Sequence, residues 1–297
     1  GREGGGTVRL GGDYQGASAG APNALRTFVG PQAAIHADAL DHGDGGRVIV
    51  WSDEVTRVQG RIQARGGPQG GRGGFVETSG KRDLAFDARV DVGAPRGAMG
   101  TVLLDPTTID IVGGTGDGAT DGTATFAGTP GAVNATVNFT DTGPTTIHQS
   151  ELEGIVGGDV ILEATDAITT SGTFTGSAVT LANNTNLTLR TRNNLTDGTG
   201  GINLVGSVTG VNLEWRTQGT GTITMQSGSA ALNQAAPLTV GKLVTGGGAV
   251  TVQSSGSAVV RGVVTTPGTP GNGGAIAIKS GGFMTLDQID ARKNGGG

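Results

Sequence analysis

The sequence predicts an all-β fold, a right-handed parallel β-helix (a solenoid) of about ten to thirteen coils. The first observation behind this prediction is a five-residue strand phrase that recurs along the chain. The second is a set of weaker strand phrases between the copies. The third is composition, because 59 of the 297 residues are glycine, 3% are aromatic, and long helix patterns are nearly absent.

The recurrent phrase begins with a small residue and has apolar residues at its third and fifth positions, as in Gly46–Val50 (GRVIV). Further copies are Gly6–Leu10, Gly100–Leu104, Gly158–Leu162, Ser177–Leu181, Gly221–Met225, Gly248–Val252 and Gly274–Ile278. Several successive copies are roughly 19 to 28 residues apart, a spacing typical of solenoids. Alternation with a period of two places Val250 and Val252 on one strand face and Thr251 on the other. We expect one face of each strand to form the core and the other to form the outer wall.

Weaker strand phrases lie between the copies and are separated by Gly, Asn, Asp and Pro residues, which favour turns. They are Ala34–His36, Leu187–Leu189, Leu238–Val240 and Met284–Leu286. Each coil is therefore expected to hold two or three short strands. Glycines at the corners are expected to supply backbone conformations with positive φ. Because one coil cannot bury its own apolar side chains, its neighbours must complete the core.

Two other structures fit part of this pattern. Chains rich in glycine and threonine are often disordered, although such chains usually lack regularly spaced Val, Ile and Leu residues. A β-sandwich would also contain many short alternating strands. Both are alternatives to the β-helix at the level of the sequence.

The distribution of the repeated strand phrases divides the chain into three parts. Residues 1–112 and 147–297 are expected to form β-helix coils, and residues 113–146 an irregular or protruding segment. One short helix is expected at Ser150–Ile155, with Ser150 as its N-cap. Both ends of the sequence lie within Gly-rich repeats, so we expect the chain to be a segment of a larger protein.

Composition excludes several function classes. Without cysteine there are no disulfides and no thiolate metal sites. The formal net charge of −5 and the lack of a basic stripe with aromatic residues argue against nucleic-acid binding. The sequence contains neither a signal peptide pattern nor an apolar run long enough to span a membrane.

The nearest feature to a basic cluster mixes both signs of charge. Its basic members are Arg57, Arg61, Arg65, Arg72, Lys81, Arg82 and Arg89, and its acidic members are Asp53, Glu54, Glu77, Asp83 and Asp87. We interpret it as a solvated wall in which opposite charges pair from coil to coil at about 5 Å. A contact surface for sulfated or otherwise anionic sugars is the alternative.

Catalytic patterns are weak. Asp83 and Asp87 form the best carboxylate pair, but four strand residues separate them by about 13 Å, more than two-carboxylate glycoside hydrolysis uses. His36, His42 and His148 are far apart in the sequence, and no serine lies in a nucleophile elbow. We therefore expect no enzyme and assign no catalytic residue.

Calcium is the ligand that the sequence best allows. Asp41, Asp44, Asp117 and Asp121 lie in Gly-rich loops, where carboxylates can surround a hard cation. Neither loop matches an EF-hand or the calcium-binding nonapeptide repeat. Aspartates that only form turns explain the same pattern, so no metal or cofactor is assigned.

Threonine rows and tryptophans are the remaining candidate surfaces. The threonines are those of Thr169–Thr173 together with Thr185, Thr188, Thr191 and Thr196, and their spacing is too irregular for an ice-binding array. Trp51 and Trp215 each follow a pair of apolar positions. They can stack on a sugar face or pack against a loop or the next coil, and we expect packing.

Several stretches resemble the filamentous-haemagglutinin family of large secreted exoproteins. They are Gly11–Gly16 (GGDYQG), Arg26–Gly30 (RTFVG), Ala37–Asp41 (ADALD), Gly43–Trp51 (GDGGRVIVW), Gly73–Lys81 (GGFVETSGK), Gly100–Ile111 (GTVLLDPTTIDI) and Gln149–Gly154 (QSELEG). The resemblance covers roughly residues 5 to 165. After about residue 165, the chain resembles this family only in the composition of its repeats.

This resemblance implies a β-helical shaft segment of a two-partner-secreted adhesin. Such a protein passes through an outer-membrane transporter and is secreted or displayed at a Gram-negative surface, where it mediates cell adhesion or biofilm formation, with host-cell or surface glycans as possible partners. We expect the family's N-terminal secretion domain, with its transporter-recognition motif, to lie outside this segment. The alternative function is a carbohydrate-binding or polysaccharide-processing β-helix.

Overall fold

A computed structural model describes residues 1–18, 20, 22–116, 145–192, 200–205, 213–228, 235–265 and 273–292. The chain forms two compact units, which are described separately. The N-terminal unit contains Gly1–Ile109 and Thr115–Ile161, and the C-terminal unit contains Asp110–Gly114 and Leu162–Gly297. Most of the predicted irregular segment, 113–146, lies outside the described residues.

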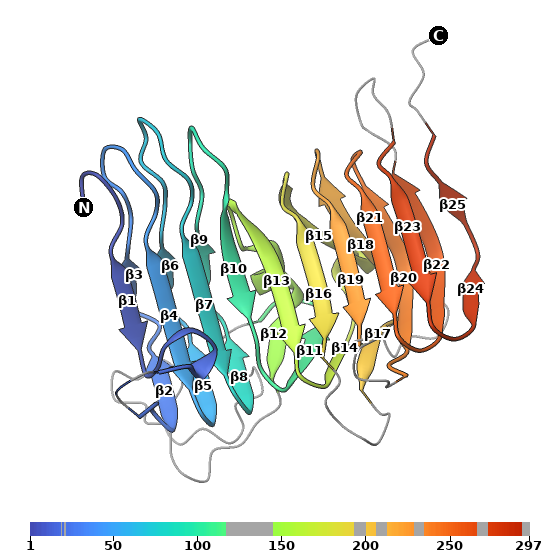
Figure 1. Ribbon diagram of the computed structural model, residues 1–297, viewed down its shortest axis with the longest axis horizontal. Helices are drawn as coiled ribbons and strands as arrows, with labels where there is room; N and C mark the ends of the chain where they lie inside the picture. Colours follow the sequence, from blue (N-terminus) through green and yellow to red (C-terminus); the bar gives the residue numbers. More distant parts are fainter. Residues whose placement is uncertain are drawn as a thin grey trace. The chain divides into compact units, whose positions relative to one another are not determined.

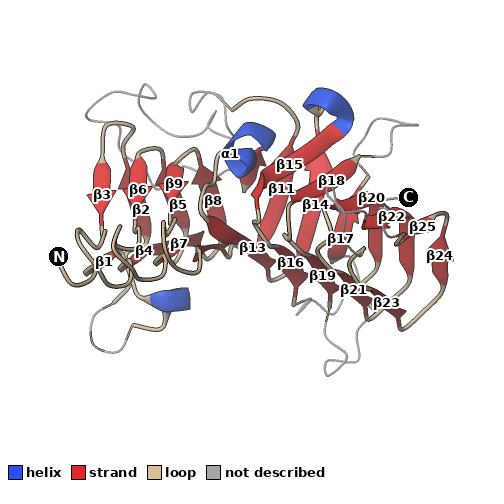
Figure 2. Cartoon of the chain, turned by 90° about the horizontal axis from the view of Figure 1, so that it is seen from above, coloured by secondary structure: helices blue, strands red, loops and turns tan. Residues whose placement is uncertain are grey.

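The N-terminal unit is built from three parallel sheets (Figure 1). The first contains β1 (Thr7–Leu10), β4 (Arg47–Ser52), β7 (Phe75–Gly80) and β10 (Gly100–Leu104). The second contains β2 (Arg26–Val29), β5 (Val55–Val58), β8 (Asp83–Phe86) and β12 (Thr146–His148). The third contains β3 (Ala34–His36), β6 (Arg61–Gln63) and β9 (Arg89–Asp91), seen in a row in Figure 2. From β1 to β9 the chain visits the sheets in turn, so each circuit adds one strand to each sheet.

The C-terminal unit has two parallel sheets. The first contains β16 (Leu187–Thr191), β19 (Ile223–Ser227), β21 (Val250–Ser254) and β23 (Ile276–Ser280). The second contains β14 (Ala167–Ser171), β15 (Ala178–Asn183), β17 (Gly201–Leu204), β18 (Glu214–Gln218), β20 (Leu238–Thr245), β22 (Ala258–Thr265), β24 (Met284–Leu286) and β25 (Ile289–Asp290). Two short strands of one circuit, β17 and β18, pair with successive halves of the single long strand β20.

Three short helices and two further strands complete the described elements. They are η1 (Tyr14–Gly16), α1 (Gln149–Glu153), η2 (Thr175–Ser177), β11 (Thr108–Val112) and β13 (Gly158–Ala164). Both β11 and β13 contain residues of the two units. Among the described residues, no helix is long and apolar enough to cross a membrane.

Apolar side chains stack in register through each unit and form the core. In the first sheet of the N-terminal unit, Val48, Val76 and Val102 lie one above another and are fully buried. In the C-terminal unit, Val250 and Val252 are buried while Thr251 is exposed, which confirms the predicted alternation. Stacking of β-branched side chains on a pleated face is favourable because each fills the space above its neighbour. The predicted all-β, parallel arrangement is therefore confirmed, and each weak strand phrase forms a strand.

Corner glycines such as Gly43 and Gly157 have the predicted positive φ, whereas the first glycine of the repeated phrase is required for another reason. Gly46, Gly74 and Gly100 do not have positive φ. Instead, a Cβ atom on Gly74 would lie 2.2 Å from the carbonyl oxygen of Gly46, and one on Gly100 would lie 2.2 Å from that of Gly74. Close approach between successive circuits thus excludes a side chain here.

The expectation that the outer strand face is an exposed wall is wrong for part of the N-terminal unit. Ile49 and Leu103 point outward on β4 and β10 yet are 0% and 2% exposed. Residues 11–18, which include η1 and are called the covering segment below, explain this burial. A Cβ atom on Gly16 would lie 2.7 Å from the Trp51 ring, so this segment lies directly on the sheet.

Buried hydroxyl groups form a ladder along the edge of the second sheet in the C-terminal unit. Thr217, Thr245 and Thr265 are in register on β18, β20 and β22. Their hydroxyls donate to the carbonyl oxygens of the following corner, with Thr245 Oγ1 2.6 Å from Gly248 O. These contacts satisfy carbonyl groups that the turn leaves without a strand partner.

The Thr245→Val substitution tests this ladder. Valine has nearly the same shape but leaves the Gly248 carbonyl without its donor, so we expect the free energy of unfolding to fall by about 1 to 2 kcal/mol. The measurement is urea unfolding followed by the fluorescence of Trp215, which lies in the same unit. Thr251→Val, on the exposed face of β21, is the matched control and should change stability by less than about 0.5 kcal/mol. Equal effects of the two substitutions would contradict the role of the ladder.

Candidate functional site

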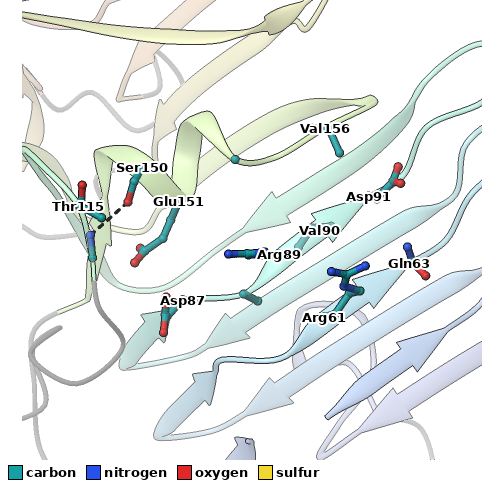
Figure 3. A pocket seen from close by; sticks show the side chains of 13 residues that line it. Arg61, Gln63, Asp87, Arg89, Val90, Asp91, Thr115, Ser150, Glu151 and Val156 are labelled. Carbon is teal, nitrogen blue, oxygen red and sulfur yellow. Dashed lines mark hydrogen bonds between the residues drawn. The ribbon is translucent and has the colours of Figure 1, made fainter. Parts of the chain in front are cut away.

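A half-enclosed cavity of about 440 Å³ lies in the N-terminal unit, between β9 and the segment that contains α1 (Figure 3). It is lined by Arg61, Gln63, Asp87, Ala88, Arg89, Val90, Asp91, Thr115, Gly116, Ser150, Glu151, Gly154 and Val156. The lining combines both signs of charge with hydroxyl, amide and apolar groups.

One wall of the cavity is α1, which directly follows β12. Leu152 and Ile155, 0% and 1% exposed, anchor it to the core. The predicted N-cap is wrong, because the helix begins at Gln149 and His148 occupies the N-cap position. Glu151 explains the difference: its Oε2 accepts from His148 N at 2.7 Å, as the acidic residue of a capping box does. Ser150 Oγ instead accepts from Gly116 N at 3.1 Å.

Two arginines project into the cavity from neighbouring strands of the third sheet. Arg61 on β6 pairs in register with Arg89 on β9, and both side chains are exposed. The next residue of each strand, Ile62 or Val90, is buried in the core. Figure 3 shows the two guanidinium groups on the cavity side of the strands. Among the described residues, neither guanidinium forms an ion pair, although the carboxylates of Asp87, Asp91 and Glu151 line the same cavity.

Arg65, which follows β6, forms ion pairs, in contrast to Arg61 and Arg89. Its guanidinium contacts Asp38 at 3.3 Å and Asp91 at 4.0 Å. The hydrogen bond to Asp38 raises the pKa of Arg65 above its ordinary value. Asp91 also accepts from Gly93 N at 3.0 Å. The carboxylate at the cavity rim is therefore directed to Arg65 and the backbone, which leaves Arg61 and Arg89 as the unmatched charges.

Two members of the mixed charge cluster, Glu54 and Arg65, form coil-to-coil ion pairs, each with a residue outside the cluster. Arg26 pairs with Glu54 at 2.5 Å, and the contact between Arg65 and Asp38 also joins successive circuits. Arg57 departs from the expectation because it is only 2% exposed, with its guanidinium carbon 6.0 Å from the centre of the Phe28 ring.

The structure places the predicted carboxylate pair in different surroundings. Asp83 forms an ion pair with Arg82 at 2.8 Å and does not line the cavity. Asp87 follows β8 and lines the cavity beside Arg89. The two carboxylates thus do not share this cavity.

The predicted calcium loops are described only in part, since Asp117 and Asp121 lie outside the described residues. Asp44 Oδ1 accepts from Arg72 N at 2.8 Å, and Asp41 lies 3.8 Å from the Arg2 guanidinium. Both contacts join residues of neighbouring circuits. Within the described part of the chain, no three His, Cys, Asp or Glu residues gather as metal ligands would.

The histidines occupy three separate local settings. His36 ends β3 with its ring nitrogen 3.8 Å from Asp38, His42 lies in the following loop, and His148 precedes α1. The threonine rows do not form one surface, because Thr185 and Thr191 are buried and Thr196 lies outside the described residues. Trp51 and Trp215 are 5% and 0% exposed, so the prediction that they pack inside the protein is confirmed.

A buried pair of carboxylates escaped the sequence analysis. Glu77 on β7 and Asp105 after β10 are 0% and 8% exposed beneath the covering segment. Gln15 holds both: its backbone N donates to Glu77 Oε1 at 3.0 Å, and its Nε2 donates to Asp105 Oδ2 at 3.1 Å. Burial raises the pKa of Glu77 to about 7, and the nearby Asp105 charge adds to the effect. The signal for this site was the apolar outward residue at Ile49 and Leu103, which flank Glu77 in register.

Comparison with known proteins adds no family to these observations. No protein-family model matches the chain, and no curated protein matches it.

Proposed function

We propose that the chain is a non-catalytic shaft segment of a large secreted surface adhesin, folded as a right-handed parallel β-helix of about ten to thirteen coils. The observation that carries this proposal is the in-register stacking of successive circuits, seen in each unit as strands that pair only with the circuits before and after them. Such stacking extends a protein in one direction. The stretches that resemble filamentous haemagglutinins add the adhesive role.

The same resemblance supports the remaining parts of the proposal. The chain would be exported by an outer-membrane transporter of a two-partner system and displayed on, or released from, a Gram-negative bacterium. The lack of cysteine suits this route, because a chain without disulfides can stay unfolded during export.

Antibodies raised against the purified chain test the adhesin proposal. We expect them to label intact cells of the bacterium that produces the chain, and we expect their Fab fragments to reduce attachment of those cells to host cells or surfaces. Fab fragments from pre-immune serum are the control. Labelling only after permeabilisation, or labelling without any effect on attachment, would contradict the proposal.

The second candidate function is carbohydrate binding, and the cavity with its two unpaired arginines favours it. Polysaccharide cleavage has less support. Glu77 and Asp105, the pair of carboxylates held together by Gln15, lie beneath the covering segment, where a polysaccharide cannot reach them.

A further inference from the structure

The paired arginines of the cavity have the geometry of an oxyanion site. Strands in a sheet are about 4.8 Å apart, so Arg61 and Arg89 extend from adjacent backbone positions and can reach one ligand together. Each guanidinium is a planar fork of N–H donors that matches the oxygens of a carboxylate. Two like charges at this separation repel each other, and one anion between them removes the repulsion. An anion is therefore the ligand that best matches this wall of the cavity.

The rest of the lining indicates what carries the anion. Val156 is 44% exposed at the cavity and offers an apolar surface. The Gln63 amide, the Ser150 hydroxyl and the Asp87 carboxylate supply donors and acceptors around it. Sugar rings combine an apolar C–H face with a rim of hydroxyl groups, so this mixture suits a sugar better than it suits an inorganic ion. The volume of about 440 Å³ admits a single sugar unit of a longer chain.

We propose that this cavity binds a carboxylate-bearing sugar unit of an acidic polysaccharide. Arg61 and Arg89 bind the carboxylate. Gln63, Ser150 and Asp87 contact the sugar hydroxyls. The cavity is only half-enclosed, so a bound unit stays connected to the solvent that holds the rest of the polysaccharide. The site stands independently of the adhesin proposal, because its binding is measured with the purified chain in solution.

Calorimetric titration with tetragalacturonate tests this site. We expect saturable binding to the full chain and at least about tenfold weaker binding of the methyl-esterified tetramer, which has the same rings but no charge. Arg61→Gln and Arg89→Gln should each weaken tetragalacturonate binding at least about tenfold, because each removes a charge-assisted hydrogen-bond donor. Arg89→Lys keeps the charge but loses the fork, so its affinity should fall between those of the wild type and Arg89→Gln.

Arg96→Gln is the matched control, because Arg96 is exposed in the same unit and lies outside the cavity lining. It should change the affinity by less than about twofold. Equal binding of the charged and esterified tetramers would overturn the proposal. So would the absence of binding, an equal loss in all three Arg→Gln variants, or tighter binding of a sulfated tetramer that is insensitive to Arg61→Gln and Arg89→Gln. Surface labelling by the antibodies described above is unaffected by any of these results.

Discussion

The Gly74→Ala substitution is expected to lower the free energy of unfolding by roughly 3 kcal/mol or more. The added Cβ atom would lie 2.2 Å from the carbonyl oxygen of Gly46 and 2.7 Å from that of Ala64. Both contacts are with backbone atoms of packed strands, which cannot move aside as a flexible side chain can. The two circuits must therefore separate locally, which stretches the hydrogen bonds between β4 and β7.

Gly6 provides a matched control for this substitution. It directly precedes β1 as Gly74 precedes β7, but a Cβ atom there meets no other atom within 4 Å, and neither glycine has positive φ. Gly6→Ala should thus change stability by less than about 0.5 kcal/mol. Urea unfolding followed by Trp51 fluorescence measures both variants in the same unit. Similar losses for both would show that backbone entropy, and not the close approach of circuits, governs these glycines.

The second large effect is a dependence of stability on pH that comes from Glu77. Burial raises the pKa of this carboxyl to about 7 in the folded chain, from an ordinary value of 4.5. Between these pH values the folded state binds more protons than the unfolded state, so the free energy of unfolding falls as pH rises. The loss attributable to Glu77 is at most roughly 3 kcal/mol and is complete above pH 7.

Glu77→Gln should remove most of this pH dependence. We expect the variant to match the wild type near pH 5 and to exceed it in stability at pH 8, as measured by urea unfolding at both pH values. Gln15→Ala is the control, because it removes the donor to Asp105 but keeps the backbone N–H that contacts Glu77. That variant should be less stable throughout and retain the pH dependence. A wild-type stability that is constant from pH 5 to 8 would contradict the role of Glu77.

The sequence predicts the parts of this fold that depend on local pattern. Alternation identifies the buried residues of β21, and turn residues separate strands such as β3 and β24 correctly. Ser150 shows the limit of local reasoning, since the sequence favours it as the N-cap, whereas the observed N-cap at His148 depends on where Glu151 points. The role of the phrase glycines was not predicted from the sequence, because only the stacked circuits reveal that lack of space excludes a side chain there.

The candidate site was beyond prediction for a related reason. Arg61 and Arg89 lie far apart in the sequence, and only the register of β6 with β9 brings them to one wall. Their lack of partners depends on Asp91 turning to Arg65, which no sequence motif encodes. Glu77 was read as one charge in a solvated wall, whereas the covering segment buries it. Local pattern thus determined the strands, while long-range register determined the chemistry.

The unequal lengths of the circuits have a practical consequence. One circuit leads from Arg47 to its register partner Phe75 and the next from Phe75 to Thr101, and these two circuits are nearly equal in length. The circuit from Thr7 to its register partner Arg47 is longer. The longer circuit includes the covering segment, yet the strands on either side keep their register. A corner of this fold therefore accepts an insertion without disturbing the stack. Foreign peptides could be grafted at such corners, which makes the chain a display scaffold with many attachment points at regular intervals.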